Sequence, residues 1–218
     1  MPLRVVLADD HPILREGLRI LLERAGIVVV GEAGDGREAV RLARALQPDV
    51  VVLDLFMPIL NGLDAGVEIF RVRPRIATVL LTVCSKPQPI WAARRAGIDG
   101  YVLKTDSIEE LIGAIRKVSG GETYMSGAAL TISLGTQGSP GDRPANPLTR
   151  RDRQVVQLIA EGKKTKEIAA LLGLSLKTAE SYRNRLMTKL DAHNTAGLVR
   201  YAVRQGLIQA VAAWCAVL

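Results

Sequence analysis

Residues 50–58 read Val-Val-Val-Leu-Asp-Leu-Phe-Met-Pro, and this stretch decides the fold. Four consecutive apolar residues, three of them β-branched, predict a strand that is buried on both faces of a parallel sheet. The strand presents the carboxylate of Asp54 at its carboxyl end, where ligands and chemistry collect in open α/β sheets. An Asp at that place is either a nucleophile or metal ligand, or merely the cap of a strand or loop.

The flanking sequence repeats the pattern of a buried strand followed by an amphipathic helix. We predict further strands over residues 3–8, 27–33, 76–82 and 98–103, each followed by a helical segment. Five strands that alternate with five helices indicate an α/β fold, a doubly wound five-stranded parallel sheet with helices on both faces.

Four of these predicted strands end in polar residues, namely Asp9-Asp10, Asp54, Thr82 and Lys104. In a doubly wound sheet such ends converge on one edge. Three carboxylates repel one another unless a cation joins them, and oxygen ligands with room for water suit Mg²⁺. The set therefore predicts a metal that holds a phosphoryl group against Asp54, which attacks phosphorus to give an acyl phosphate. Lys104 would neutralise phosphate oxygens, and the Thr82 hydroxyl would bond the new group.

The positive charge of the chain is concentrated at one end. The formal net charge is +7, and residues 147–218 carry 12 Lys or Arg against 5 Asp or Glu. Residues 135–144 are rich in Gly and Pro without an apolar period, which is typical of a linker. We therefore expect a neutral domain over residues 1–120, a linker over 121–146 and a basic domain over 147–218 that meets a polyanion.

The composition of the chain bears on its cellular location. No signal peptide opens the chain, and the apolar tail at residues 210–218 is too short to cross a bilayer. Cys84 and Cys215 form neither a disulfide framework nor a metal spacing. We expect a cytoplasmic protein without a membrane partner.

The basic domain shows only helical periodicity and is predicted to hold four helices. A capping-box pattern opens the first at Thr149, and Gly173 marks a tight turn between the second and third. This arrangement is a helix-turn-helix, whose third helix enters the major groove of double-stranded DNA. We expect Leu176 among the residues of that helix that face the domain core. Its other face carries short polar side chains with long cations alongside, which suits base and phosphate contacts. These candidate DNA contacts are Lys177, Thr178, Glu180, Ser181, Arg183, Asn184, Arg185 and Lys189.

Residues 3–120 resemble the receiver domain of a two-component response regulator. The motifs are Asp9-Asp10-His11-Pro12, Leu53-Asp54-Leu55-x-Met57-Pro58-x-x-Asn61-Gly62, Thr82 and Gly100-Tyr101-Val102-Leu103-Lys104. The resemblance implies that Asp54 accepts phosphate from a partner histidine kinase. It also implies Mg²⁺ ligands at Asp9, Asp10, Asp54 and the Phe56 carbonyl, with Thr82 and Tyr101 as the switch pair.

Residues 147–208 resemble the LuxR-type DNA-binding domain. The motifs include Leu148-Thr149-x-Arg151-Asp152, Lys166-Glu167-Ile168-Ala169 and Lys177-Thr178-x-x-x-Tyr182. Joined to a receiver, this domain makes the chain similar to a NarL/FixJ-class response regulator, which implies a homodimer when active or on DNA. Some positions depart from the family pattern. Glu180 stands at a usual base-contact position, which leaves the operator sequence open. Phe56 is bulky for the family, and Pro87 and Pro89 are expected to leave the fourth helix of the receiver short or irregular.

Two other classes of function compete with this interpretation. Gly34-Asp35-Gly36 follows a strand and opens a helix, as in a dinucleotide-binding enzyme, but that reading leaves Asp9, Thr82 and Lys104 unexplained. A phosphatase of the haloacid-dehalogenase kind would want a second Asp where Phe56 stands. We therefore expect no enzyme. A receiver-like DNA-binding regulator that does not depend on phosphorylation remains the main alternative.

Overall fold

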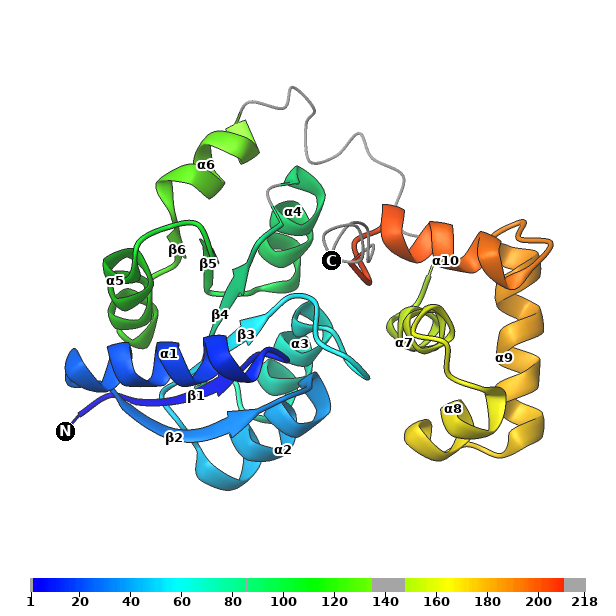
Figure 1. Ribbon diagram of the computed structural model, residues 1–218, viewed down its shortest axis with the longest axis horizontal. Coiled ribbons are helices and arrows are strands. Elements are labelled where there is room, and N and C mark those ends of the chain that lie inside the picture. The colour runs from blue at the N-terminus through cyan, green and yellow to red at the C-terminus, as the bar shows by residue number, and fades with distance from the viewer. Residues whose placement is uncertain (1, 85, 135–147, 210–218) are drawn as a thin grey trace, which may run out of the picture. The chain divides into compact units, whose positions relative to one another are not determined.

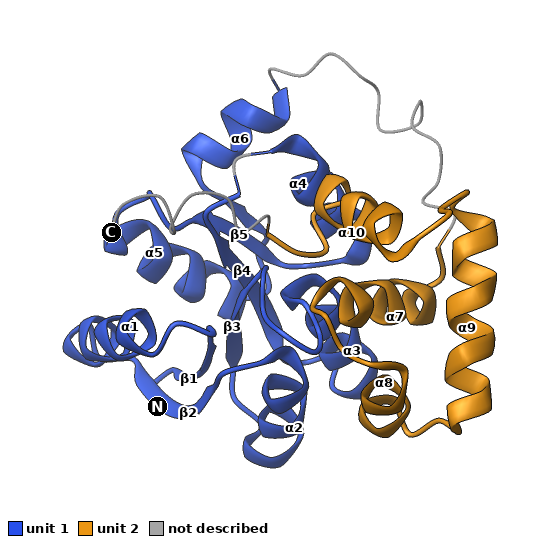
Figure 2. Ribbon diagram, turned by 45° about the vertical axis from the view of Figure 1, so that its right-hand side comes forward, with its two compact units in different colours: residues 1–143 blue, residues 144–218 orange. Residues whose placement is uncertain are grey.

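The computed structural model describes residues 2–84, 86–134 and 148–209. The chain divides into two compact units, residues 1–143 and 144–218 (Figure 2), which are described separately below. Among the described residues, no helix is both long and apolar enough to cross a membrane. The apolar tail at 210–218 lies outside the described residues.

The first unit contains a six-stranded parallel sheet in the order β2-β1-β3-β4-β5-β6. The strands are β1 (Arg4–Ala8), β2 (Val28–Ala33), β3 (Val50–Asp54), β4 (Ala77–Thr82), β5 (Gly100–Leu103) and β6 (Tyr124–Met125). Because β2 and β3 lie on opposite sides of β1, the strand order reverses beside β1. The carboxyl ends of β1 and β3 therefore border the crevice in which such sheets bind ligands.

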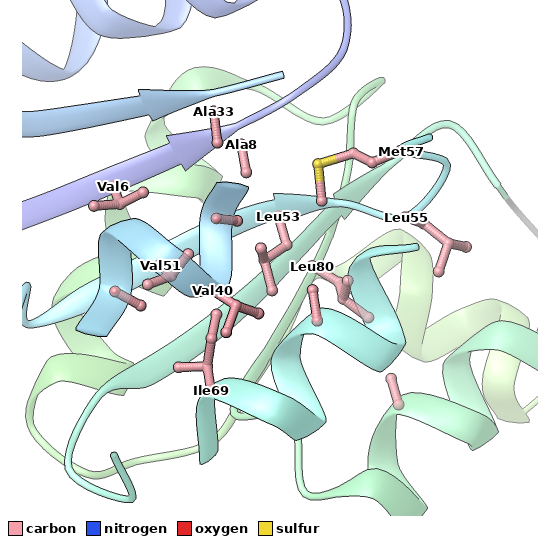
Figure 3. Packing of buried hydrophobic residues seen from close by; sticks show 14 of the residues in the cluster. Val6, Ala8, Ala33, Val40, Val51, Leu53, Leu55, Met57, Ile69 and Leu80 are labelled. Carbon is pink, nitrogen blue, oxygen red and sulfur yellow. The ribbon is translucent and has the colours of Figure 1, made fainter. Parts of the chain in front are cut away.

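Helices cover both faces of this sheet (Figure 1). They are α1 (Pro12–Arg24), α2 (Gly36–Leu46), α3 (Gly62–Val72), α4 (Pro87–Ala96), α5 (Ile108–Ser119) and α6 (Gly127–Leu134). On one face, Val51 and Leu53 of β3 pack with residues of α2 and α3, as Figure 3 shows. On the other face, Val50 and Val52 pack with residues of α1 and α5. The prediction that β3 is buried on both faces is confirmed.

The prediction of five strands missed a sixth. β6 and α6 lie within residues 121–146, which the sequence had indicated as linker. β6 is only two residues long, so it shows no period that a sequence pattern could reveal. Its position is set by the neighbouring strand: the Tyr124 amide donates to the Asp99 carbonyl (2.8 Å) and the Ser126 amide to the Tyr101 carbonyl (3.0 Å). Residues 135–146 of the predicted linker lie outside the described residues.

The expectation of a short or irregular fourth helix was wrong. α4 is ten residues long and begins at Pro87. Pro87 and Pro89 occupy its first and third positions, where a helix needs no amide hydrogen because no preceding turn exists to accept it. The two prolines therefore start the helix three residues earlier than the apolar pattern indicates.

The described residues of the second unit, 148–209, form a small all-α domain of four helices. These are α7 (Arg150–Ala160), α8 (Thr165–Leu172), α9 (Leu176–Lys189) and α10 (Thr195–Arg204), which pack around a common apolar core. Gly173 ends α8 with a positive φ of 62°, and a three-residue turn then leads to Leu176 at the start of α9, as a helix-turn-helix requires. Leu176, predicted to face the core, is 49% exposed, because it is the first residue of α9 and lies beyond the packed turns.

Candidate functional site

The polar residues predicted at the strand ends lie together in the first unit. Asp54 is the last residue of β3, Asp9 directly follows β1, and Lys104 directly follows β5. The Lys104 ammonium lies 2.6 Å from Asp9 Oδ2 and 3.3 Å from Asp54 Oδ1. The two carboxylates are almost fully buried, at 3% and 4% exposed. Parallel pairing aligns the carboxyl ends of β1, β3 and β5, and this alignment brings together residues 45 to 95 positions apart in the chain.

Burial makes the Asp54 carboxylate costly to ionise. Desolvation raises the pKa of Asp54 to about 6, against the opposing effect of the Lys104 ammonium, while the negative charges of Asp9 and Asp10 raise it further. A divalent cation at the site would favour the ionised form. Such a cation would therefore promote the state in which Asp54 is a nucleophile.

The acidic residues fit a hard divalent cation. Asp9, Asp10 and His11 each present a ligand atom, and these atoms lie within 4.8 Å of one another. His11 Nδ1 lies 2.8 Å from Asp10 Oδ1. Asp9 Oδ2 and Asp54 Oδ1 are buried, and the Lys104 ammonium is the close polar neighbour of both within the described chain. Buried carboxylate oxygens with spare capacity are the ligands that Mg²⁺ prefers.

The loop after β3 holds Asp54 in place. Asn61 caps α3 by accepting the Asp64 amide, and the Gly62 amide donates to the Leu55 carbonyl (3.0 Å). A Cβ atom at Gly62 would lie 2.1 Å from the Asp54 carbonyl oxygen, so the backbone packs this closely only because residue 62 is Gly. Phe56 lies half-buried against the adjoining apolar core.

Thr82 and Tyr101, the predicted switch pair, are joined through the backbone of Cys84. The Cys84 amide donates to Thr82 Oγ1 (3.1 Å), and the Tyr101 hydroxyl donates to the Cys84 carbonyl (3.2 Å). Tyr101 already lies inside the protein, and burial raises the pKa of its phenol above the ordinary value. Sequence reasoning missed the role of Cys84 as the link between Thr82 and Tyr101, because its backbone makes both hydrogen bonds and any residue type could do so.

The candidate DNA contacts on α9 divide into two groups. Lys177, Thr178, Glu180, Ser181 and Asn184 lie exposed on its surface. The three remaining cations make contacts inside the second unit, and these are Arg183 with Thr195 (2.6 Å), Arg185 with Asp152 (2.7 Å) and Lys189 with Asp152 (3.1 Å). The sequence identified Asp152 as part of a capping box and of the LuxR-type motif, but not as a partner of these cations. The i, i+4 spacing of Arg185 and Lys189 was the available signal for a shared partner.

Comparison with known proteins covers both units. The model of the response regulator receiver domain matches residues 5–116, and that of the luxR family of bacterial regulatory proteins matches residues 146–202. The transcriptional regulatory protein MctR of Rhizobium johnstonii is 38% identical over 96% of this chain and 97% of its own length.

Two solved structures of RcsB extend the likeness. RcsB from Salmonella enterica serovar Typhimurium, bound to promoter P1flhDC in the presence of phosphomimetic BeF3−, is 30% identical with a TM-score of 0.60, over 92% of this chain and 98% of that one. A structure of two RcsB dimers bound to two parallel DNAs is 28% identical with a TM-score of 0.60, over 94% of this chain and 99% of that one. The present chain therefore belongs to the NarL/FixJ family of two-component response regulators, DNA-binding proteins rather than enzymes, with a receiver and a LuxR-type helix-turn-helix domain.

Proposed function

We propose that Asp54 accepts a phosphoryl group from a partner histidine kinase and that this event controls DNA binding by the second unit. The observation that carries the proposal is the pair of buried carboxylates, Asp9 and Asp54, around the Lys104 ammonium at the crevice beside β1. A buried, cation-flanked carboxylate at that place suits nucleophilic attack on a phosphoryl group better than it suits a structural role.

The residues of the site divide the chemistry among them. A carboxylate oxygen of Asp54 forms a bond to phosphorus while the bond from phosphorus to the donor's imidazole nitrogen breaks, and that nitrogen leaves with the electron pair. Mg²⁺ held by Asp9 and Asp10, with Asp54 and the Phe56 carbonyl as further ligands, would neutralise charge on the phosphoryl oxygens. The Lys104 ammonium neutralises the same oxygens from the side of β5.

The switch follows from the contact between Thr82 and Cys84. When the Thr82 hydroxyl turns to the phosphoryl group on Asp54, its hydrogen bond from the Cys84 amide is lost. The Cys84 carbonyl accepts from Tyr101, so the rearrangement reaches β5 and the face of the sheet beside α4. Such coupling shifts the population between two arrangements of the receiver.

We further propose that the active form binds double-stranded DNA as a homodimer in the cytoplasm, with α9 in the major groove. The structure of RcsB dimers on DNA supports this assembly for the family. The exposed Lys177, Thr178, Glu180, Ser181 and Asn184 would lie nearest the bases, with Arg183, Arg185 and Lys189 nearer the backbone.

Phosphoryl uptake is the first test of this proposal. Incubation with a small phosphodonor and Mg²⁺ is expected to add one phosphoryl group to the wild type and none to Asp54→Ala, as measured by intact mass. DNA affinity measured with and without the donor then separates the two regulatory models. Uptake by neither protein, or a DNA affinity that does not change with the donor, would favour the regulator that does not depend on phosphorylation.

Phe56 is expected to prolong the phosphorylated state. Its half-buried ring lies two residues from Asp54 and would screen the acyl phosphate from water. Phe56→Asn should therefore shorten the half-life of the phosphorylated protein, followed by loss of the added mass after the donor is removed. An unchanged half-life would contradict this role, and Phe56→Leu serves as the control that keeps an apolar screen.

A further inference from the structure

Asp152 is a charged residue buried at the start of the second unit. Its side chain is 1% exposed, and it is the third residue of α7. Asp152 Oδ2 accepts the Thr149 amide (3.0 Å), and the Asp152 amide donates to the Thr149 hydroxyl (3.1 Å). This reciprocal cap needs only one of the two carboxylate oxygens, and a cap alone does not require burial.

Both oxygens of Asp152 also bind cations of α9. Arg185 Nη2 lies 2.7 Å from Oδ1, and Lys189 Nζ lies 3.1 Å from Oδ2. The guanidinium of Arg185 also lies 4.5 Å from the centroid of the Tyr182 ring. One carboxylate of α7 therefore holds two successive turns of α9, the helix that carries the candidate DNA contacts.

The carboxylate stays ionised in this setting. Burial opposes ionisation, but the hydrogen bonds from Lys189, Thr149 and Arg185 hold the pKa of Asp152 at about 2. The cluster of Asp152, Arg185 and Lys189 consequently carries a net charge of about +1 near neutral pH instead of +2.

We propose that Asp152 is a positioning residue that fixes α9 and sets how much of its positive charge is available to DNA phosphates. The inference rests on the proposed role of α9 in DNA binding and specifies how that role is tuned. Arg185 remains 57% exposed, so its guanidinium can approach a phosphate while Asp152 still neutralises part of its charge. Lys177 differs, because it is exposed and has no acidic partner within the described chain.

The physical consequence is a limited number of released counterions. The slope of log affinity against log salt is negative, and each phosphate neutralised by a protein cation increases its magnitude by about 0.9. Because Asp152 neutralises about one positive charge on α9, the magnitude of the salt slope is smaller by about 0.9 than the number of cations on α9 would give. Weaker binding to DNA of arbitrary sequence follows, which leaves discrimination to base contacts.

The test measures salt dependence with the full chain and a fluorescently labelled duplex of arbitrary sequence, by anisotropy from 50 to 200 mM NaCl. Asp152→Asn keeps an oxygen that can accept the Thr149 amide but removes the charge. Glu167→Gln is the matched control, because Glu167 is also the third residue of its helix and accepts the Lys164 amide (2.7 Å). It has no cation of α9 as a partner in the described chain.

Asp152→Asn is expected to steepen the slope by about 0.9, which adds roughly a 3.5-fold loss of affinity across that salt range, while Glu167→Gln leaves the slope unchanged. An unchanged slope in Asp152→Asn, or an equal change in both variants, would overturn the proposal. The equal change would mean that only the overall charge matters.

A triple variant keeps the test decisive if Asp152→Asn does not fold. Asp152→Asn, Arg185→Gln and Lys189→Gln together leave a neutral cluster without a buried charge. We expect the slope to fall by about 0.9, whereas a fall of about 1.8 would show two freely available cations and overturn the proposal. A wild type that binds no duplex at the lowest salt would instead refute the DNA-binding role of α9, and the inference with it.

Discussion

Asp54→Asn is expected to raise the free energy of unfolding of the first unit by about 3 kcal/mol at pH 7 without metal. Burial raises the pKa of the Asp54 carboxyl to about 6 in the folded protein, from an ordinary value near 4. Above pH 6 the wild type therefore keeps a charge that the fold disfavours, at about 1.4 kcal/mol for each pKa unit. The amide of Asn has no such charge.

The gain in stability from Asp54→Asn depends on pH. A carboxyl group whose pKa is raised by folding contributes its full stability below about pH 4, and the contribution is lost as the pH rises through about 6. The difference between variant and wild type should thus vanish well below pH 4 and reach its plateau above pH 7, as followed by thermal unfolding in EDTA. Adding Mg²⁺ should raise the melting temperature of the wild type more than that of Asp54→Asn, because the variant lacks one carboxylate ligand. A wild type more stable than the variant at pH 7 in EDTA would contradict the argument.

Gly62→Ala is expected to destabilise the first unit by about 3 kcal/mol and to slow phosphoryl uptake by Asp54. The added Cβ atom would lie 2.1 Å from the Asp54 carbonyl oxygen, and a backbone atom cannot move aside as a flexible side chain can. The loop after β3 must therefore shift, and Asp54 shifts with it. Urea unfolding and intact mass after treatment with a small phosphodonor measure the two effects.

Gly113→Ala in α5 is the matched control for this substitution. A Cβ atom at Gly113 meets no atom within 4 Å, and the helix interior gains from Ala. This variant should be more stable than the wild type by about 0.5–1 kcal/mol and should keep its rate of phosphoryl uptake. Equal behaviour of the two alanine variants would mean that the close approach at Gly62 has no effect on the site.

Sequence patterns predicted the parts of the fold that follow from periodic apolar residues and from regular sheet geometry. The five longer strands and the convergence of Asp9, Asp54 and Lys104 follow from buried apolar runs and from the geometry of parallel sheets. The same patterns could not show β6, because two residues form a strand only where Asp99 and Tyr101 offer backbone partners.

The contacts of the second unit were harder to foresee for another reason. The sequence predicted Arg185 and Lys189 as cations alongside the polar face of α9, where they would contact phosphates, and gave no acidic partner for them. Their partner, Asp152, is 33 and 37 residues away, and only the packing of α7 against α9 brings it near. The capping box already accounted for an Asp at position 152, so the sequence offered no reason to predict ion pairs between Asp152 and α9.

The folding of β6 and α6 onto the first unit also shortens the tether between the two units. A connection over residues 121–146 could span roughly 90 Å when fully extended, whereas residues 135–147 can span only about 45 Å. When the length of the connection between two domains is halved, the local concentration of one domain around the other rises by about threefold. A connection shortened in this way would raise the effective concentration of the receiver around the DNA-binding domain of the same chain.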